Sequence, residues 1–234
     1  MRDAYPHGVP SSRIIAIDGP AGSGKSSVSR EVARRIGARY LDTGAMYRAL
    51  TWAVLQRGAD PTDPGQVRQV VADVVLDSGT DPDHPTITVD GVDVAAPIRS
   101  DEVTAAVSAV SSVPEVRAHL VSLQREHVAN SPAGIVVEGR DIGSVVLPDA
   151  PVKVFLTASP TVRARRRAAQ DERERDQVRD VQQTETALAA RDAVDSTRAV
   201  SPLAAATDAV VLDTSDMEFD EVVASILRLI DERV

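Results

Sequence analysis

The chain has 234 residues, of which 43% are hydrophobic, and its formal net charge is −9 at pH 7. This length predicts one domain with an ordinary core. The negative charge argues against a nucleic-acid partner, and the lack of cysteine excludes disulfides and thiolate metal sites. No stretch approaches the roughly 18 apolar residues that a membrane helix needs. Residues 1–12 lack the apolar core of a signal peptide, so we expect a cytoplasmic protein with a disordered polar extension at residues 1–12.

A glycine-rich loop follows the first predicted strand. Residues 14–17 form an apolar run, and a helical stripe of apolar residues begins at Val28. Between them, residues 19–26 read GPAGSGKS, which matches the phosphate-binding loop G-x-x-x-x-G-K-[ST]. The amides of such a loop surround phosphate oxygens, its lysine (Lys25) reaches the β- and γ-phosphates, and its serine (Ser26) ligates Mg²⁺. This stretch predicts a nucleoside triphosphate site.

The region before residue 100 contains a departure from alternating strands and helices. A strand is expected at 39–41 and a helix at 45–56, and Asp63 is expected to cap a helix that runs from Pro64 to about Val75. Apolar runs then flank Asp90-Gly91, a dipeptide preferred in hairpin turns. A hairpin at this point predicts an inserted subdomain at approximately 60–100.

The remaining chain returns to alternating elements. We expect strands at 135–137, 152–156 and 210–212 and helices at 103–113, 114–130 and 219–230. Two more helices are expected between the last two strands: a long one that begins at Ser159-Pro160 and a further one that ends at about residue 191. Residues 171–181 are nearly all charged, which predicts a mobile, solvated segment. Together the five apolar strands predict an α/β fold, a doubly wound parallel five-stranded sheet.

Ligands of such sheets bind beyond the carboxyl ends of the strands. That rule directs attention to Asp42-Thr43, residues 138–141, Thr157-Ala158 and residues 213–215. The D-x-x-G and N/T-K-x-D motifs of GTPases are missing, and the Asp-Glu strand end of ATP motors is replaced by Glu138. A small-molecule kinase needs a second binding site and a charged flap, and residues 60–100 and 163–180 are candidates for these parts.

Five stretches resemble bacterial cytidylate (CMP) kinases of the nucleoside monophosphate kinase family. They are IDGPAGSGKS (17–26), LDTGAMYR (41–48), IRSDEV (98–103), EGRDIG (138–143) and RDAVDSTRAVSPL (191–203). The resemblance implies a Mg²⁺-dependent monomer that transfers the γ-phosphate of ATP to CMP and dCMP. It also implies a single kinase domain at 13–234, with a core (13–59 and 100–234), a monophosphate-binding insert at approximately 60–100 and a lid at approximately 163–190.

The resemblance further implies a role for each matching position. The donor would contact Gly19, Pro20, Ala21, Gly22, Ser23, Gly24, Lys25, Ser26 and Ser27 and the lid residues Arg163, Arg166 and Arg167. The acceptor would contact Thr43, Tyr47, Arg48, Ser108, Arg117, Arg140, Asp141, Arg191, Asp195 and Arg198. Lys25, Arg48, Arg140 and Arg198 would be catalytic, and Ser26 would hold the metal ion.

The chemistry of the reaction is consistent with those roles. A monophosphate with a second pKa near 6 is largely dianionic, so it needs no general base but does need compensating positive charge. Asp141 accepting from the 4-amino group of cytosine would disfavour uracil.

Plainer interpretations remain open: the three lid arginines share one helical face and could be solvated, and Asp195 and Arg198 could be a simple i,i+3 pair. A kinase for a different acceptor and a nucleotide-binding regulator without turnover are the alternative functions. One departure from the family pattern is Glu138, where aspartate is common.

Overall fold

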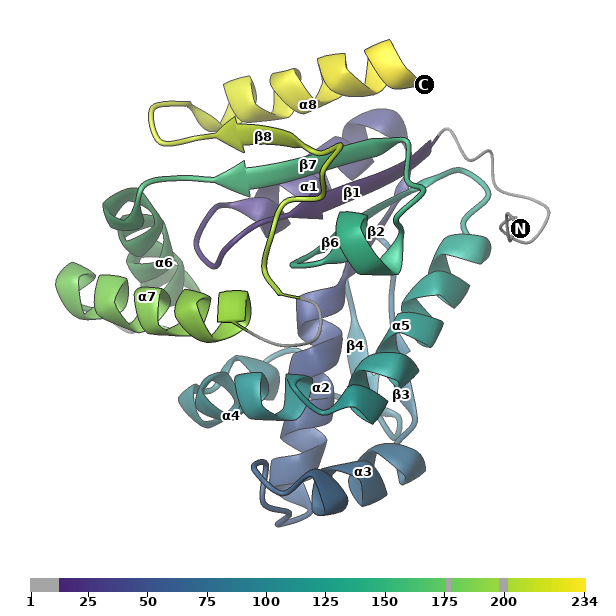
Figure 1. The fold of residues 1–234 in the computed structure, drawn as a ribbon, viewed down its shortest axis with the longest axis vertical. Helices are drawn as coiled ribbons and strands as arrows, with labels where there is room; N and C mark the ends of the chain where they lie inside the picture. The colour runs from purple at the N-terminus through teal and green to yellow at the C-terminus, as the bar shows by residue number, and fades with distance from the viewer. Residues whose placement is uncertain (1–12, 176–177, 198–201) are drawn as a thin grey trace.

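The computed structural model describes residues 13–175, 178–197 and 202–234. The expected extension at 1–12 and the predicted site residue Arg198 lie outside these ranges. Within them, five parallel strands form one sheet in the order β2-β6-β1-β7-β8 (Figure 1). The strands are β1 (Ile14–Asp18), β2 (Arg39–Asp42), β6 (Ile135–Gly139), β7 (Val152–Thr157) and β8 (Val210–Asp213). The predicted fold class is therefore confirmed.

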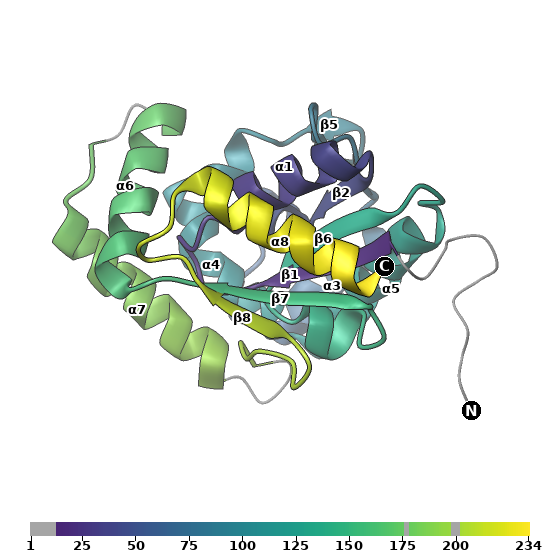
Figure 2. The ribbon, with the colours of Figure 1, turned by 90° about the horizontal axis from the view of Figure 1, so that it is seen from above.

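The central strands are apolar because helices cover both faces of the sheet. Every residue of β1 and β6 is buried, and Ile14 pairs in register with Ile135. The helices α1 (Lys25–Ile36) and α8 (Phe219–Arg233) pack on one face, where Ile15 and Ile226 share a core. The helices α2 (Thr43–Gln56) and α5 (Pro114–Ala129) pack on the other (Figures 1 and 2).

A second, antiparallel sheet lies below the main one in Figure 1. It contains β3 (Leu76–Ser78), β4 (Ile87–Val89) and β5 (Val92–Asp93). Asp90 and Gly91 both have positive φ, at 51° and 78°, which is the geometry that a tight hairpin turn requires. The helix α3 (Pro64–Asp73) begins after Asp63, whose carboxylate accepts from the amides of Gly65 and Gln66. The sheet and α3 pack against the core on the α2 side.

The helices that follow these elements differ in detail from the sequence predictions. The helix α4 (Asp101–Ser111) begins two residues earlier than expected, because the Ser100 hydroxyl accepts from the Val103 amide and caps it. The helices α6 (Pro160–Arg175) and α7 (Val181–Thr197) pack against each other beyond the end of β7 (Figure 1). Among the described residues, no helix is both long and apolar enough to cross a membrane.

The prediction of a solvated segment at 171–181 holds for Glu172, Arg173, Val178 and Asp180, which are exposed, and is wrong for Asp171. The mobility of the segment stays a prediction. The helix α6 continues to Arg175, and Asp171 is only 3% exposed. Its carboxylate pairs with Arg167 (2.9 Å) and with Arg179 (3.1 Å). The helix expected to end near residue 191 continues to Thr197. These helices bury Asp171 and Asp195 beside arginines in place of a continuous apolar stripe, so hydrophobic periodicity does not indicate where they end.

Candidate functional site

The phosphate-binding loop connects β1 to α1 and packs tightly against its surroundings. A side chain at Gly19 would place its Cβ 2.0 Å from the carbonyl oxygen of Leu156 on β7. Gly24 precedes α1 with φ of 89°, and no side chain caps the amides of the first turn. The helix therefore directs unbonded N–H groups and its positive dipole end toward the loop, the arrangement that binds phosphate.

Lys25 is the first residue of α1 and curls back over the loop. Its Nζ donates to the Pro20 carbonyl (2.8 Å). Burial, and after it the positive charge of Arg140, lowers the pKa of Lys25 to about 8. The lowered pKa means that negative charge near the Lys25 ammonium does not fully balance it. A bound polyanion would supply the missing negative charge.

A cavity of about 580 Å³ opens beside this loop, at the carboxyl ends of the strands. Its lining residues come from segments between Ala21 and Val222. The predicted site residues that line it are Ala21, Gly22, Ser23, Gly24, Lys25, Ser26, Ser27, Thr43, Tyr47, Arg48, Ser108, Arg117, Arg140, Asp141, Arg166, Arg167, Arg191 and Asp195. Gly19, Pro20 and Arg163 do not line it.

Two arginines that line this cavity, Arg48 and Arg191, have lowered pKa values. Burial, followed by the charges of Arg191 and Arg167, lowers the pKa of Arg48 to about 9. Burial and Arg140 lower the pKa of Arg191 to about 10. A backbone hydrogen bond orients the Arg48 side chain, because its Nη1 donates to the Ile98 carbonyl (3.1 Å). Such a concentration of incompletely neutralised guanidinium groups suits a ligand with several negative charges.

Two aspartates on α7 hold part of this cluster, and only one of them was predicted. Asp195 pairs with Arg140 at 3.1 Å, whereas the unpredicted Asp192 pairs with both Arg140 (3.5 Å) and Arg163. Arg163 also donates to the Ala21 carbonyl of the phosphate-binding loop (3.1 Å). It therefore connects α6 to the loop, whereas Arg166 and Arg167 line the cavity. The only signal for Asp192 was its place beside Arg191 in the RDAVD stretch.

A buried ion pair also lines the cavity. Arg117 on α5 and Asp141, which follows β6, are each 5% exposed, and the guanidinium of Arg117 donates to the Asp141 carboxylate. The same guanidinium lies 5.6 Å from the centroid of the Tyr47 ring. Ser108 on α4 lines the same cavity. Together these groups offer donors and an acceptor to a flat polar ligand.

Glu138 is an acid beside the proposed metal ligand Ser26. It is 3% exposed, accepts a hydrogen bond from the Tyr40 hydroxyl and is hydrogen-bonded to Ser26. Burial, and then the charge of Asp42, raises the pKa of Glu138 to about 7. The described residues contain no cluster of three or more His or acidic side chains that could hold a metal ion. A serine hydroxyl beside carboxylates nevertheless fits Mg²⁺, which takes few protein oxygens and completes its shell with phosphate and water.

Further cavity residues were not identified from the sequence. Arg99, Gln170 and Arg173 line the cavity, as do Met217, Glu218, Phe219 and Val222 around the start of α8. Thr214 was indicated only by the strand-end rule, and Arg166 donates to its hydroxyl (2.8 Å) and its carbonyl (2.7 Å). Arg99 belongs to the IRSDEV stretch, although no role was predicted for it. The residues on α6 and around the start of α8 belong to no motif and reach the cavity only through the packing of those helices.

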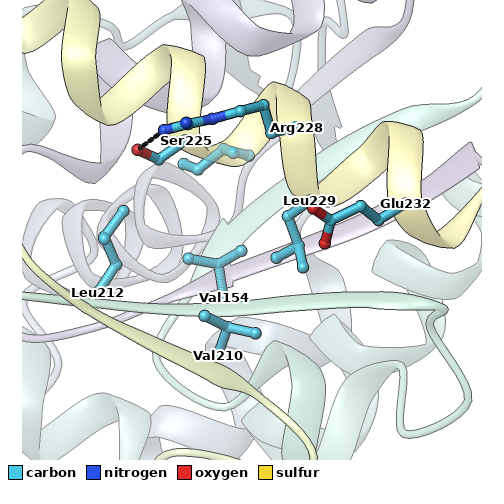
Figure 3. A pocket seen from close by; sticks show the side chains of 8 residues that line it. Val154, Val210, Leu212, Ser225, Arg228, Leu229 and Glu232 are labelled. Atoms are coloured by element: carbon cyan, nitrogen blue, oxygen red, sulfur yellow. Dashed lines mark hydrogen bonds between the residues drawn. The ribbon is translucent and has the colours of Figure 1, made fainter.

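A smaller hollow of about 270 Å³ lies between β7, β8 and α8 (Figure 3). Its lining is mostly aliphatic, with Val154 and Val210 on the strands and Leu229 on the helix. The guanidinium of Arg228 at its rim donates to the Ser225 hydroxyl (3.2 Å). We assign chemistry to the larger cavity because that is where the charged groups converge.

Comparison with known proteins agrees with this geometry. The family model for cytidylate kinase matches residues 15–232. The cytidylate kinase of Streptomyces avermitilis is 54% identical over 220 residues, covering 94% of this chain and 93% of the relative. That of Mycobacterium leprae is 53% identical and covers 94% and 96%. A solved structure of an uncharacterized protein from Eubacterium ventriosum shares the fold, with a TM-score of 0.52, 14% identity and coverage of 95% and 99%. The chain therefore belongs to the cytidylate kinase family of enzymes.

Proposed function

We propose that this protein transfers the γ-phosphate of ATP to CMP and dCMP, giving CDP or dCDP and ADP. Family membership supports the reaction type. The observation that carries the proposal is that Lys25 of the phosphate-binding loop, Arg48 and the buried Asp141 all line one cavity. A triphosphate at one end and a monophosphate at the other would bring the reacting groups together between them.

In this reaction an oxygen of the acceptor phosphate attacks the γ-phosphorus, and the bond from that phosphorus to the β–γ bridging oxygen breaks. The electron pair of that bond stays with ADP. The acceptor oxygen is already ionised, so no side chain has to remove a proton. The barrier is lowered by positioning and by neutralising the negative charge that two phosphates bring together. Ser26 would hold Mg²⁺, which would supply positive charge to offset the negative charge of the phosphates.

The protein's own cations divide this work. Lys25 and the amides of residues 19–27 would hold the donor phosphates. Arg48 and Arg140 would bind the acceptor phosphate and stabilise the charge on the transferring group, together with Arg198. Arg166 and Arg167 on α6 would close over the donor, with residues 163–190 as the lid and residues 60–100 as the insert around the acceptor.

Base selectivity would come from the buried ion pair between Arg117 and Asp141. Asp141 would accept from the 4-amino group of cytosine, with Arg117 and Ser108 beside it. Uracil presents an acceptor at that position, which would leave two acceptors facing each other without a proton between them. Arg191 and Asp195 would contact the sugar, and such contacts need not involve the 2′-hydroxyl, so dCMP should also react.

A steady-state assay with ATP and Mg²⁺ against CMP, dCMP, UMP and AMP, detecting ADP, tests this proposal. Turnover confined to CMP and dCMP is the expected result. Preference for AMP or for an acceptor that is not a nucleotide would assign the chain to another kinase activity. Tight ATP binding without turnover on any acceptor would support a nucleotide-binding regulator instead. We further propose a cytoplasmic monomer, and light scattering of the purified protein tests the monomer.

A further inference from the structure

The backbone around Asp141 poses a problem that the aspartate does not solve by itself. Asp141 stands immediately before a short helical turn, Ile142–Val146, in the position that caps a helix. An aspartate in that position ordinarily turns its carboxylate back onto the amides of the turn that follows. Here the Asp141 side chain makes no capping hydrogen bond and pairs with Arg117 in the cavity. Another group must therefore satisfy the amides that Asp141 leaves.

That group is Asp18, the last residue of β1. Its Oδ1 accepts from the Ile142 amide and its Oδ2 accepts from the Gly143 amide, both at 2.8 Å. Asp18 is 4% exposed and is separated from these partners by more than 120 residues of chain. The contact arises because β1 and β6 are parallel neighbours in which Asp18 pairs with Gly139. The Asp18 side chain is thereby placed beside the residues that leave β6.

The fit around this contact is close. A Cβ built on Gly143 would lie 3.5 Å from Asp18 Oδ2 and 3.2 Å from the Cδ of Lys153. Burial raises the pKa of Asp18 to about 6, while the two amides oppose that rise. The carboxylate is therefore mainly ionised at neutral pH, and both of its oxygens accept hydrogen bonds.

We propose that Asp18 is a positioning residue for the acceptor base: it caps the turn after Asp141 and thereby leaves the Asp141 carboxylate available to face the cavity. Asp18 touches neither substrate nor metal in this role. It links the strand that carries the phosphate-binding loop to the segment that reads the base. This inference rests on the proposed function, because the property it explains is the selectivity for cytosine.

Removing the cap should make the Asp141 carboxylate divide its time between the amides of the turn that follows it and the base site in the cavity. In Asp18→Ala the amides of Ile142 and Gly143 lose their acceptor, and the Asp141 carboxylate, which stands in the cap position, can replace it at the Gly143 amide. Each time Asp141 turns toward its own backbone, the base site loses its acceptor. Asp18→Asn should act more weakly, because its Oδ1 can still accept from one amide while its NH₂ group cannot accept from the other.

The test is a double-mutant cycle read as the ratio of kcat/KM for CMP to that for UMP. We expect Asp18→Ala to lower this ratio about tenfold, the effect of weakening one hydrogen bond to a charged group. Asp18→Asn should fall between it and the wild type. In an Asp141→Ala background, Asp18→Ala should change the ratio by less than about twofold, because the residue it positions is gone. An unchanged ratio in Asp18→Ala, or an equal fall in both backgrounds, would overturn the proposal.

Two further measurements separate positioning from general destabilisation. Asp63→Ala is a matched control, because Asp63 also accepts from two backbone amides, those of Gly65 (2.8 Å) and Gln66 (3.3 Å), at the start of α3. It should lower the unfolding temperature and leave the CMP-to-UMP ratio unchanged, and an equal fall of the ratio in this control would count against Asp18. Hydrogen exchange on the wild-type protein needs no variant: the amides of Ile142 and Gly143 should be protected, and rapid exchange at both would refute the cap.

The outcomes also distinguish the two proposals. A wild-type enzyme that prefers CMP, combined with an unaltered ratio in Asp18→Ala, removes the inference about Asp18 and leaves the proposed function standing. A wild-type enzyme that shows no preference for CMP removes both.

Discussion

Replacing Gly22 with alanine tests whether ATP binding depends on the direct packing of α6 against the phosphate-binding loop. Gly22 occupies a position where the loop motif accepts any residue. Its φ is +77°, and a Cβ there would lie 2.7 Å from the carbonyl oxygen of Arg163 on α6. The alanine must therefore adopt a strained backbone conformation and also push α6 away from the loop.

The chain offers a control that shares the strain and lacks the contact. Gly37, which ends α1, has φ of +64° and no atom within 4 Å of a built Cβ. A left-handed alanine costs roughly 1–2 kcal/mol in either place. Only Gly22→Ala should also break the hydrogen bond from Arg163 to Ala21, now 3.1 Å long, at a further cost of about 1 kcal/mol.

The measurements are thermal unfolding and the KM for ATP. Both variants should unfold a few degrees lower, at about 2–4 °C per kcal/mol for a chain of this size. Only Gly22→Ala should raise the KM for ATP, by about fivefold, since the displaced helix carries Arg166 and Arg167. If the two variants share one KM for ATP while both are destabilised, ATP binding does not depend on the contact between α6 and the loop, and the reasoning fails.

Three other changes probe the charges of the site. Lys25→Ala should lower kcat at least about a hundredfold without lowering the unfolding temperature, because it removes a phosphate-binding ammonium that is buried at a cost; ADP release and thermal unfolding measure both. Asp192→Asn should lower kcat/KM for CMP about tenfold by releasing Arg140 and Arg163, and a loss confined to thermal stability would contradict that role. The raised pKa of Glu138, about 7 against an ordinary 4.5, means that the folded protein retains a proton that the unfolded chain has lost, so this group's contribution to stability falls as pH rises from 4.5 to 7. The unfolding temperature of Glu138→Gln minus that of the wild type, measured without nucleotide, should therefore grow across this window, and a constant difference would show that the carboxyl titrates normally.

Local features of the site were predictable from the sequence because they are encoded in neighbouring residues. The phosphate-binding loop needs only eight consecutive positions, and the central strands are continuous apolar runs because both faces are covered. The Asp90-Gly91 hairpin and the Asp63 cap likewise depend on residues next to each other in the chain. In each case the physical cause is contained within one or two turns of backbone.

The partners of the charged side chains were not predictable in this way. Arg163, Arg166 and Arg167 share one helical face, yet Arg163 meets the phosphate-binding loop, Arg166 meets Thr214 and Arg167 meets Asp171. Helical spacing says which residues point in a similar direction and nothing about what they meet. The burial of Asp171 in the charged stretch after residue 170 was missed for the same reason, because it depends on ion pairs that helical spacing does not indicate.

The sequence by itself determined the class of fold, the location of the phosphate-binding loop and the order of the strands along the chain, since these follow from local pattern. Only the tertiary structure decided that Asp18 caps the turn after Asp141 and that Asp192 joins Arg140 to Arg163. The physical reason is that both contacts connect residues whose proximity is created by the pairing of β1 with β6 and the packing of α6 against α7. A carboxylate carries no sign in the sequence of which distant amide or guanidinium it will meet.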